Sequence, residues 1–596
     1  MNRRTMLKAG AAALSVAVAP SALKAASFRR LRPGETGWPS TTAWDALGRS
    51  VGGNLIKPEP LLGPCASGND AACAEVLKHL QNPLFIGDQP SGTQVSGWFN
   101  AWTPVPSAYV VRARDARDVA VAVTFAREHR LRLAVKGGAH SYQGTSTAGD
   151  SLLIWTRSMK VVEVHDAFVP RGCAGAPVPA VSVGAGALWI DAYDAVTTKA
   201  GRFVQGGGCT TVGVAGLVQS GGFGSSSKGF GMASASLIEA EVVTADGAIR
   251  IANACTNADL FWALKGGGGG SFGVVTRLTL RTHTLPEFFG VAGGTIEAAS
   301  DAAFRRLIDR FMAFYASDLF NPHWGEQAAV KPSNELEIGL VSQGLNAAEN
   351  VAALKPFFDW VRNQRSDYSF TEEPYGGAVA ARTWWDLEAR RKRGSKAMVA
   401  DDRPGAPPTH AWWSGDQEQC GAFIYGYDSV WLPQSLLGAE RRGALVEALF
   451  QASRHNDIEL HFNKGLAGAT EEALASARNV ATNPAVLNAF ALAIAARGGA
   501  SRYPGLPNAP RDSAKALRGA QAVDAAIAPL RQVAPNAGSY VSESNYFNAD
   551  WARAFWGTNY PRLRAVKAKY DPDGLFIVHH GVGSEDWSAD GFVRRS

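Results

Sequence analysis

The sequence predicts an α+β protein: an α/β domain at residues 103–287, followed at residues 288–539 by an antiparallel sheet with helices on one side. Three observations support this prediction. A chain of 596 residues is too long for one ordinary core, so it should divide into domains. A strand–helix–strand pattern opens the first region. In the second region, helical patterns such as "DAAFRRLIDRFMAFYA" alternate with extended runs such as "ELEIGLVS".

The strand–helix–strand pattern begins with the extended run "AYVVRA". Asp115 is placed to cap the helix that follows. Val119, Val123 and Ala126 recur in that helix at helical spacing, and "LRLAV" gives the second strand. A glycine-rich stretch comes directly after this second strand.

Other elements follow from local signals. Residues 27–102 are rich in proline, glycine and tryptophan with little periodicity, so an irregular lead-in is expected there. A helix at 187–200 is expected to stop at Gly201, because glycine commonly ends helices. The stretch "LIEAEVVTADGAIRIAN" predicts a strand, an Asp-Gly turn and a second strand.

The first 26 residues have the composition of an export signal. A charged start, a short weakly apolar run and small residues describe a signal peptide, and the Arg3-Arg4 pair resembles the twin-arginine type. A plain Sec signal or a basic disordered tail are the alternatives. The expected partner of the precursor is the export machinery, and the expected location is periplasmic or secreted. No later segment is long and apolar enough to span a membrane.

The charge balance does not indicate a nucleic-acid partner. The formal net charge is +6, but four of the basic residues lie in the first 26, which hold no acid, so 6 − 4 = +2 remains. Of the six cysteines, Cys65 and Cys73 are close enough in sequence for a small disulfide loop, a pairing that the sequence leaves open. The other four show no metal-ligand spacing, and no metal is expected.

Three glycine-rich loops follow three different strands, and the first of them reads "VKGGAHSYQG" at 135–144. The loops lack the nicotinamide-dinucleotide fingerprint, because "VGAGALW" has no third glycine and no acid about 20 residues on. Several such loops can converge on one extended anionic ligand and hold its pyrophosphate with backbone N–H groups.

The loop sequences "KGGAHSYQG" and "GGGCTTVGVAGLVQSGGFG" resemble the PCMH-type FAD domain of the vanillyl-alcohol-oxidase superfamily. The stretch "FWGTNYPRLRAVKAKYDPDGLF" resembles the C-terminal signature of berberine-bridge-enzyme-like oxidases, so residues 540–582 are expected to return to the FAD domain. The resemblance implies FAD as the cofactor, bonded covalently by His140 and Cys209.

The residue types suit that chemistry, because a neutral imidazole is a nucleophile and nearby N–H dipoles would favour a thiolate. The resemblance places further residues along the FAD, namely Gly137, Gly138, Ala139, Ser141, Gly213, Gly216, Gly222 and Val274. Ala139 and Thr210 depart from the family pattern, which usually has glycine or no residue at the first position and often proline at the second.

A flavin oxidase needs a base to take the substrate's proton while hydride leaves its carbon. Tyr540, Glu543 and Tyr546 lie near the family's Tyr-x-Asn-Tyr segment, and a tyrosine base would need a lowered pKa. His461, which shares one strand face with Glu459 and Asn463, is the other candidate; a polar sheet surface is the alternative reading of that face.

Three more features of the sequence are candidates for roles in the site. His579 and His580 are expected on opposite faces of a strand, which suits a metal poorly. The pairs at 384–385 and 412–413 are tryptophans expected in the core, with stacking on a sugar or aromatic substrate as the alternative. The run "RRKR" at 390–393 is expected to be a solvated face.

The sequence therefore predicts an exported FAD-dependent oxidase acting on a sugar or another hydroxylated compound, with O2 reduced to H2O2. A dehydrogenase passing electrons to a quinone or cytochrome is one alternative. A flavin-binding protein without turnover is the other.

Overall fold

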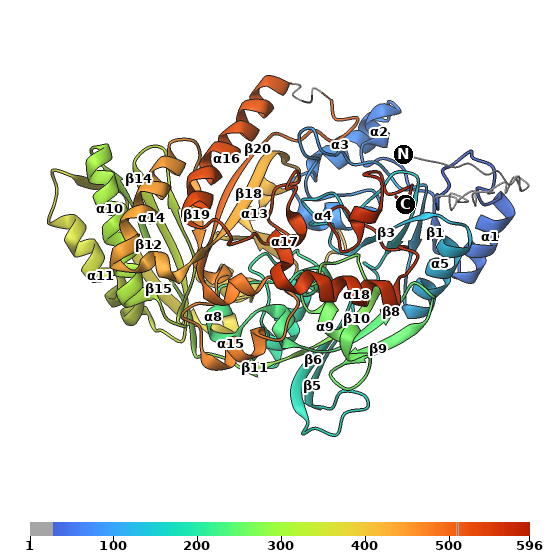
Figure 1. Ribbon diagram of the computed structural model, residues 1–596, viewed down its shortest axis with the longest axis horizontal. Helices are drawn as coiled ribbons and strands as arrows, with labels where there is room; N and C mark the ends of the chain where they lie inside the picture. The colour runs from blue at the N-terminus through green and yellow to red at the C-terminus, as the bar shows by residue number, and fades with distance from the viewer. Residues whose placement is uncertain (1–27, 508, 510–511, 596) are drawn as a thin grey trace, which may run out of the picture.

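The computed structural model describes residues 28–507, 509 and 512–595. The predicted export signal at 1–26 lies outside these residues. Figure 1 shows an elongated molecule in which the first half of the chain and the C-terminal helices lie at one end, and a large sheet with its helices lies at the other. The α+β fold class is confirmed.

The first sheet has the strand order β1-β2-β4-β3, and β4 runs parallel to both β2 and β3. Its strands are β1 Leu55–Ile56, β2 Tyr109–Arg112, β3 Arg132–Lys136 and β4 Ser151–Trp155. Helix α5, Ala116–Glu128, joins β2 to β3, and the Asp115 side chain caps it by accepting hydrogen bonds from the N–H groups of Arg117 and Asp118. The predicted strand–helix–strand unit is present.

The second sheet is antiparallel, with the order β5-β6-β10-β8-β9. Its strands are β5 Val162–Phe168, β6 Val178–Gly184, β8 Leu237–Val243, β9 Ile249–Asn253 and β10 Val274–Arg281. Three short helices pack with it: α6 Trp189–Tyr193, α7 Val214–Gln219 and α9 Ala258–Leu264. After α6 the helix continues as a π-helical turn, Asp194–Lys199, and it ends before Gly201, whose φ is 66°. The helix expected at 187–200 is therefore present, in two parts.

The second half of the chain forms one antiparallel sheet of seven strands in the order β15-β12-β14-β13-β19-β20-β18. These are β12 Phe288–Ala298, β13 Trp324–Val330, β14 Glu335–Gln343, β15 Tyr368–Ala380, β18 Phe423–Pro433, β19 Ile458–His461 and β20 Ala489–Gly499. Four helices cover one of its faces (Figure 1): α10 Asp301–Phe314, α11 Ala347–Arg362, α14 Ala439–Ser453 and α16 Ser513–Val533. Their apolar faces and the sheet share the largest core of the molecule.

Between β15 and β18 the chain leaves this sheet. It forms the short helix α12, Leu387–Lys392, then the two-stranded ribbon β16 Met398–Ala400 and β17 Ala411–Trp413, and finally helix α13, Ser414–Gln419. The first half also contains the short helix α8, Ser227–Phe230, and the second half contains α15 Glu471–Ala477 and α17 Trp551–Trp556.

The lead-in at 27–102 is not irregular, contrary to the prediction. It contains the helices α1 Thr41–Ser50, α2 Gly63–Ala66, α3 Asp70–Lys78 and α4 Pro83–Gly87. The side chains of Ser40, Asn69 and Asn82 cap three of them, and short helices that depend on caps show little periodicity. The segment also supports the first glycine loop, because Lys136 at the end of β3 donates hydrogen bonds to the carbonyls of residues 89, 90 and 92.

Two disulfides are present. Cys65 pairs with Cys73, which answers a question that the sequence left open. Cys173 pairs with Cys255, which the sequence did not predict, and joins the β5–β6 connection to the segment after β9. Cys209 and Cys420 are free thiols.

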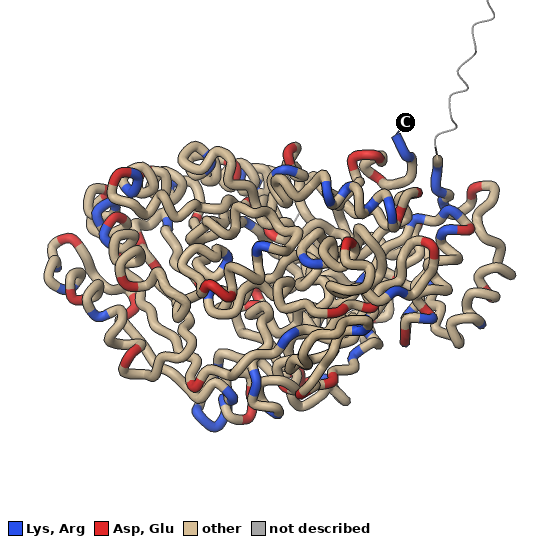
Figure 2. The backbone as a smooth tube through the Cα atoms, turned by 60° about the horizontal axis from the view of Figure 1, so that its bottom comes forward, with Lys and Arg blue, Asp and Glu red and all other residues tan. Residues whose placement is uncertain are grey.

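The charges and hydropathy of the described residues are unremarkable for a large globular protein. Figure 2 shows basic and acidic residues interspersed along the backbone trace.

Across residues 28–507, 509 and 512–595, no helix combines the length and apolar composition needed to cross a bilayer. Within the same residues, no group of three or more His, Cys, Asp or Glu is arranged to hold a metal ion.

The C-terminal segment returns to the first domain. Helix α18, Tyr560–Tyr570, packs against α9, and Trp556 just before it donates a hydrogen bond of 3.0 Å to the Gly266 carbonyl in the third glycine loop. Lys567 on α18 is buried and donates to the Ser271 carbonyl, the Phe576 carbonyl and the Asp571 carboxylate, each at 2.6 Å. This lysine therefore ties α18 to the end of the third glycine loop.

We expect Lys567→Met to lower the free energy of unfolding by roughly 3–5 kcal/mol, because it leaves the buried Asp571 carboxylate without its counter-charge. Lys569→Met, on the exposed side of the same helix, removes a surface pair with Asp259 and should have a much smaller effect, because water screens exposed ion pairs. Denaturant unfolding of the two variants beside the wild type measures both values. Equal losses for the two lysines would contradict this account of α18.

Candidate functional site

One cavity of about 1140 Å³ lies between the two halves of the molecule. All three glycine-rich loops line it, together with residues of the seven-stranded sheet, of the segment between β15 and β18, and of the C-terminal segment. Binding pockets for drug-sized molecules usually measure about 300–1,000 Å³, so this cavity has room for an extended cofactor and a second molecule.

The first and second glycine loops touch each other at the cavity wall. A Cβ atom added at Gly138 would lie 2.8 Å from the Gly213 nitrogen and 3.1 Å from the Thr211 carbonyl oxygen, closer than side-chain carbons come to backbone atoms. Only glycine allows this approach. The contact brings His140 of the first loop and Cys209 of the second loop to the same cavity.

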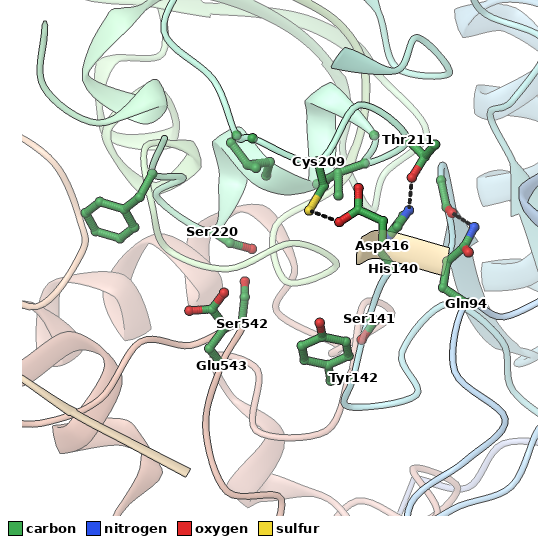
Figure 3. Close-up of a pocket in the computed structure, with 18 of the residues that line it drawn as sticks. Gln94, His140, Ser141, Tyr142, Cys209, Thr211, Ser220, Asp416, Ser542 and Glu543 are labelled. Carbon is green, nitrogen blue, oxygen red and sulfur yellow. Dashed lines mark hydrogen bonds between the residues drawn. The ribbon is translucent and has the colours of Figure 1, made fainter. Parts of the chain in front are cut away.

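His140 is held in its position by the second loop. Its Nε2 atom lies 3.1 Å from the Thr211 hydroxyl oxygen (Figure 3). Burial lowers the pKa of His140 to about 4, although the contact with Thr211 opposes part of this shift. The imidazole is therefore neutral at pH 7 and retains a nucleophilic nitrogen, as the sequence predicted.

Cys209 differs from the expectation that its surroundings favour a thiolate. Burial raises the pKa of its thiol well above the ordinary value, and the negative charge of Asp416 raises it further. The thiol donates a hydrogen bond of 3.3 Å to Asp416 Oδ1, so a carboxylate that can accept its proton is in place (Figure 3). The other oxygen, Oδ2, is buried and has no partner among the described residues.

Helix α13 lies outside the glycine loops and contacts both the first and the second of them, the first through Gln94. Asp416 on this helix contacts the second loop, while Cys420, just past its end, lies 3.5 Å from the Gln94 side-chain oxygen. Gln94 in turn donates to the Gly138 carbonyl of the first loop at 3.2 Å. No motif in the sequence pointed to Asp416 or Gln94, because both act through neighbours that are distant along the chain.

Most of the predicted cofactor residues line the cavity. These are Gly137, Gly138, Ala139, His140, Ser141, Cys209, Gly213 and Gly216. Ala139, the departure noted in the sequence, has a left-handed φ of 66°, a conformation that favours glycine. Gly222 and Val274 do not line the cavity, contrary to the prediction. Val274 points into the core beside β3, and its neighbours Gly273 and Val275 face the cavity instead.

The glycines also leave room for a ligand. A Cβ added at Gly208, Gly216 or Gly269 would meet no atom within 4 Å, although all three residues line the cavity. Each would project into free space along the walls made by the second and third loops. Bare backbone along these walls leaves room for an extended anionic ligand, so these residues fit a dinucleotide such as FAD.

Two of the three candidate bases near the C-terminus line the cavity. Burial raises the pKa of Tyr540 above its ordinary value, and the charge of Glu543 adds to this shift, so the lowered pKa that a tyrosine base needs is not found. Glu543 forms an ion pair with Lys464 through both carboxylate oxygens, at 2.7 and 2.6 Å. Tyr546 does not line the cavity; its ring stacks on His579 at 3.7 Å between centroids.

The strand face with His461 is a wall of the cavity rather than an outer sheet surface. Glu459 and His461 on β19 line it, as does Asn463, which lies in the 3-10 turn Phe462–Lys464 after the strand rather than on the strand as predicted. His461 Nε2 lies 2.9 Å from Glu459 Oε2, and His461 Nδ1 is buried without a hydrogen-bond partner among the described residues. Because the carboxylate holds the proton on Nε2, Nδ1 is left with a free lone pair. This arrangement can accept a proton from a bound molecule.

The remaining candidates fall in unexpected places. His579 and His580 lie in a turn rather than on a strand, and their rings stack 3.8 Å apart at the cavity wall. The φ of His580 is 51°, which turns both rings to the same side. Trp384, Trp385 and Trp413 line the cavity, whereas only Trp412 has the predicted core position.

The comparisons with known proteins support FAD as the cofactor. Residues 106–253 match the family model of the FAD binding domain, and residues 534–583 match that of berberine and berberine-like proteins. An FAD-linked oxidoreductase of Aspergillus versicolor is 29% identical over 99% of this chain and 94% of its own length. A VAO-type flavoprotein oxidase of Thermothelomyces thermophilus is 28% identical over 94% of both.

Solved structures give the same picture of the fold. A VAO-type flavoprotein from Myceliophthora thermophila superimposes with a TM-score of 0.76 at 25% identity, covering 95% of this chain and all of that one. Glucooligosaccharide oxidase from Acremonium strictum, described with 6-S-cysteinyl, 8α-N1-histidyl FAD, superimposes with a TM-score of 0.61 at 19% identity, covering 82% of this chain and 94% of that one.

The family models and relatives identify the chain as an FAD-linked oxidoreductase, and the cavity is its candidate cofactor site. The chain contains an FAD binding domain and a berberine-like C-terminal segment, and along its length it is similar to FAD-linked oxidoreductases and VAO-type flavoproteins, as the loop sequences indicated.

The pair formed by Glu459 and His461 predicts a change in acid stability. Burial acts to raise the pKa of Glu459, but the hydrogen bond and charge of His461, together with Lys464, hold it below its usual value. An acid of this kind stabilises the fold above its unfolded pKa and loses that contribution as the pH falls through the folded pKa. We expect His461→Leu to raise the folded pKa of Glu459, so that this stability is lost at a higher pH.

Denaturation midpoints measured from pH 7 to pH 3 test this expectation. The matched control is His455→Leu, which replaces an exposed histidine three residues before β19 and should follow the wild-type curve. If His461→Leu also follows the wild-type curve, the two side chains are not coupled as described.

Proposed function

We propose that this FAD-linked oxidoreductase is an exported oxidase that holds its flavin through two covalent bonds, to His140 and to Cys209. The observation that carries the proposal is the contact between the first two glycine loops, which brings both nucleophiles to one cavity. The relative from Acremonium strictum, described with a cysteinyl and histidyl FAD, supports it.

The residues around the two nucleophiles fit this role. Thr211 orients the neutral His140 imidazole, which leaves its other nitrogen free to bond the flavin. Asp416 Oδ1 takes the proton of the Cys209 thiol as the sulfur becomes a nucleophile, which a thiol of raised pKa requires. Each covalent bond would replace a C–H bond of the flavin, and O2 would accept the two electrons released. The three glycine loops bind the pyrophosphate with backbone N–H groups.

The substrate is proposed to be a sugar or another hydroxylated compound. A bound FAD would supply a two-electron acceptor for the hydride of the substrate carbon, and O2 would take up the electrons to give H2O2. His461 Nδ1 takes the hydroxyl proton, while Glu459 holds Nε2 and stabilises the charge that develops on the ring. Two of the solved relatives, a chitooligosaccharide oxidase and a carbohydrate oxidase of Microdochium nivale, act on carbohydrates and support this substrate class.

Export is proposed from the twin-arginine-type segment at residues 1–26. Two disulfides support it, because structural disulfides persist mainly in oxidising compartments outside the cytoplasm.

We expect acid precipitation to leave flavin on the wild-type protein and on each of the variants His140→Ala and Cys209→Ser, since one link remains in each. The double variant should release all of its flavin into the supernatant. Cys420→Ser, which removes the other free thiol, should keep both links, and mass spectrometry of the flavin peptides identifies them. Complete release from the wild type would refute covalent attachment.

Oxidase activity is tested separately, without knowledge of the substrate. We expect the dithionite-reduced protein, mixed with air-saturated buffer in a stopped-flow instrument, to reoxidise fast enough for turnover, at a few per second or more, and to form H2O2 in the same amount as flavin. Reoxidation over many minutes would instead favour a dehydrogenase that passes electrons to a quinone or cytochrome.

A further inference from the structure

The basic run at 390–393 is not uniformly solvated, contrary to the prediction. Arg391, Lys392 and Arg393 are exposed, but Arg390 is buried, with 9% of its surface exposed, and it lines the cavity. Helix α12 is amphipathic at this point, so one arginine of the run turns inward while its neighbours face solvent.

Two indole rings frame the guanidinium of Arg390. Its Cζ atom lies 4.8 Å from the ring centroid of Trp384 and 4.6 Å from that of Trp413. Cation–π contacts of this kind occupy the faces of the guanidinium and leave its edge free. Both tryptophans line the same cavity, so the three side chains form an aromatic frame around one positive charge.

The charge of Arg390 has no anionic partner in the described part of the chain. Nε donates to the Trp384 carbonyl, but Nη1 and Nη2 donate to no described residue, and Nη2 is buried. Burial lowers the pKa of Arg390 to about 10, and the nearby Arg393 contributes, yet the group stays charged at neutral pH. A buried charge without a partner is costly, and proteins retain one where a ligand supplies the counter-charge.

The position of the frame identifies which ligand this is. Trp413 Nε1 donates a hydrogen bond of 2.8 Å to the Gly208 carbonyl, directly before Cys209. If Cys209 holds the flavin ring, as proposed above, the frame lies at the ring end of the cofactor. The pyrophosphate would be held by backbone N–H groups of the glycine loops, whereas Arg390 belongs to the segment between β15 and β18, so a second molecule is left as its partner.

We propose that Arg390, framed by Trp384 and Trp413, is a substrate subsite that binds a carboxylate. The free edge of a guanidinium matches the two oxygens of a planar carboxylate, and the indoles pack against the apolar or ring portion next to it. The substrate is then a hydroxylated compound with an acid group, such as a sugar acid or an aromatic hydroxy acid. This specificity rests on the proposed function.

Binding of benzoate and of its neutral counterpart benzamide to the purified flavoprotein, measured by calorimetry, tests the subsite. We expect the wild type to bind benzoate roughly tenfold to a hundredfold more tightly than benzamide. Arg390→Gln should remove this preference. Arg391→Gln, one position along the same helix, should keep it. Arg390→Lys keeps the positive charge but loses the two parallel N–H donors of the guanidinium, so it should show an intermediate preference. This variant tests the subsite if the glutamine variant fails to fold.

Three outcomes would overturn the proposal: no preference for benzoate in the wild type, an unchanged preference in Arg390→Gln, or loss of flavin from Arg390→Gln, which would make the arginine a cofactor ligand. Phenyl phosphate binding more tightly than benzoate would overturn the assignment of a carboxylate. Calorimetry needs neither turnover nor a covalent link. A benzoate preference that depends on Arg390 therefore stands even if acid releases the flavin, and the two proposals fail separately.

Discussion

The close approach of the first two glycine loops is the constraint on which the site depends. A Cβ at Gly138 would lie 2.8 Å from the Gly213 nitrogen, and a Cβ at Gly213 would lie 3.1 Å from the Gly138 nitrogen. A side chain at either position would separate the loops, and with them His140 and Cys209. The contact between Thr211 and His140 joins the same two loops. One local packing arrangement therefore sets both the distance between the loops and the orientation of the His140 imidazole.

The second half of the chain supplies the chemistry that the glycine loops lack. The loops carry two nucleophiles and many backbone N–H groups, but no carboxylate. Asp416 reaches Cys209 from helix α13, and His461 faces the cavity from β19 of the large sheet. The segment between β15 and β18 also contributes the Arg390 frame. In the proposed arrangement the first domain holds the cofactor, while the second domain surrounds its reactive end.

The sequence revealed the parts of this site that are local in the chain. His140 and Cys209 sit inside glycine loops whose composition is visible without a structure. Asp416 was missed because its partner is 207 positions away, and the raised pKa of Cys209 follows from that distant contact. Arg390 was assigned to solvent because a basic run gives no sign of which residue turns inward. Tyr546 and Val274 were misplaced because spacing alone cannot fix the side to which a residue points in a turn or at a strand end.

The crystal structure of the purified flavoprotein tests the central claim most directly. The account predicts continuous electron density from the flavin ring to His140 on one edge and to Cys209 on the other, with the two loops in contact as described. Separate density for the ring, with the Cys209 sulfur still hydrogen-bonded to Asp416, would contradict it.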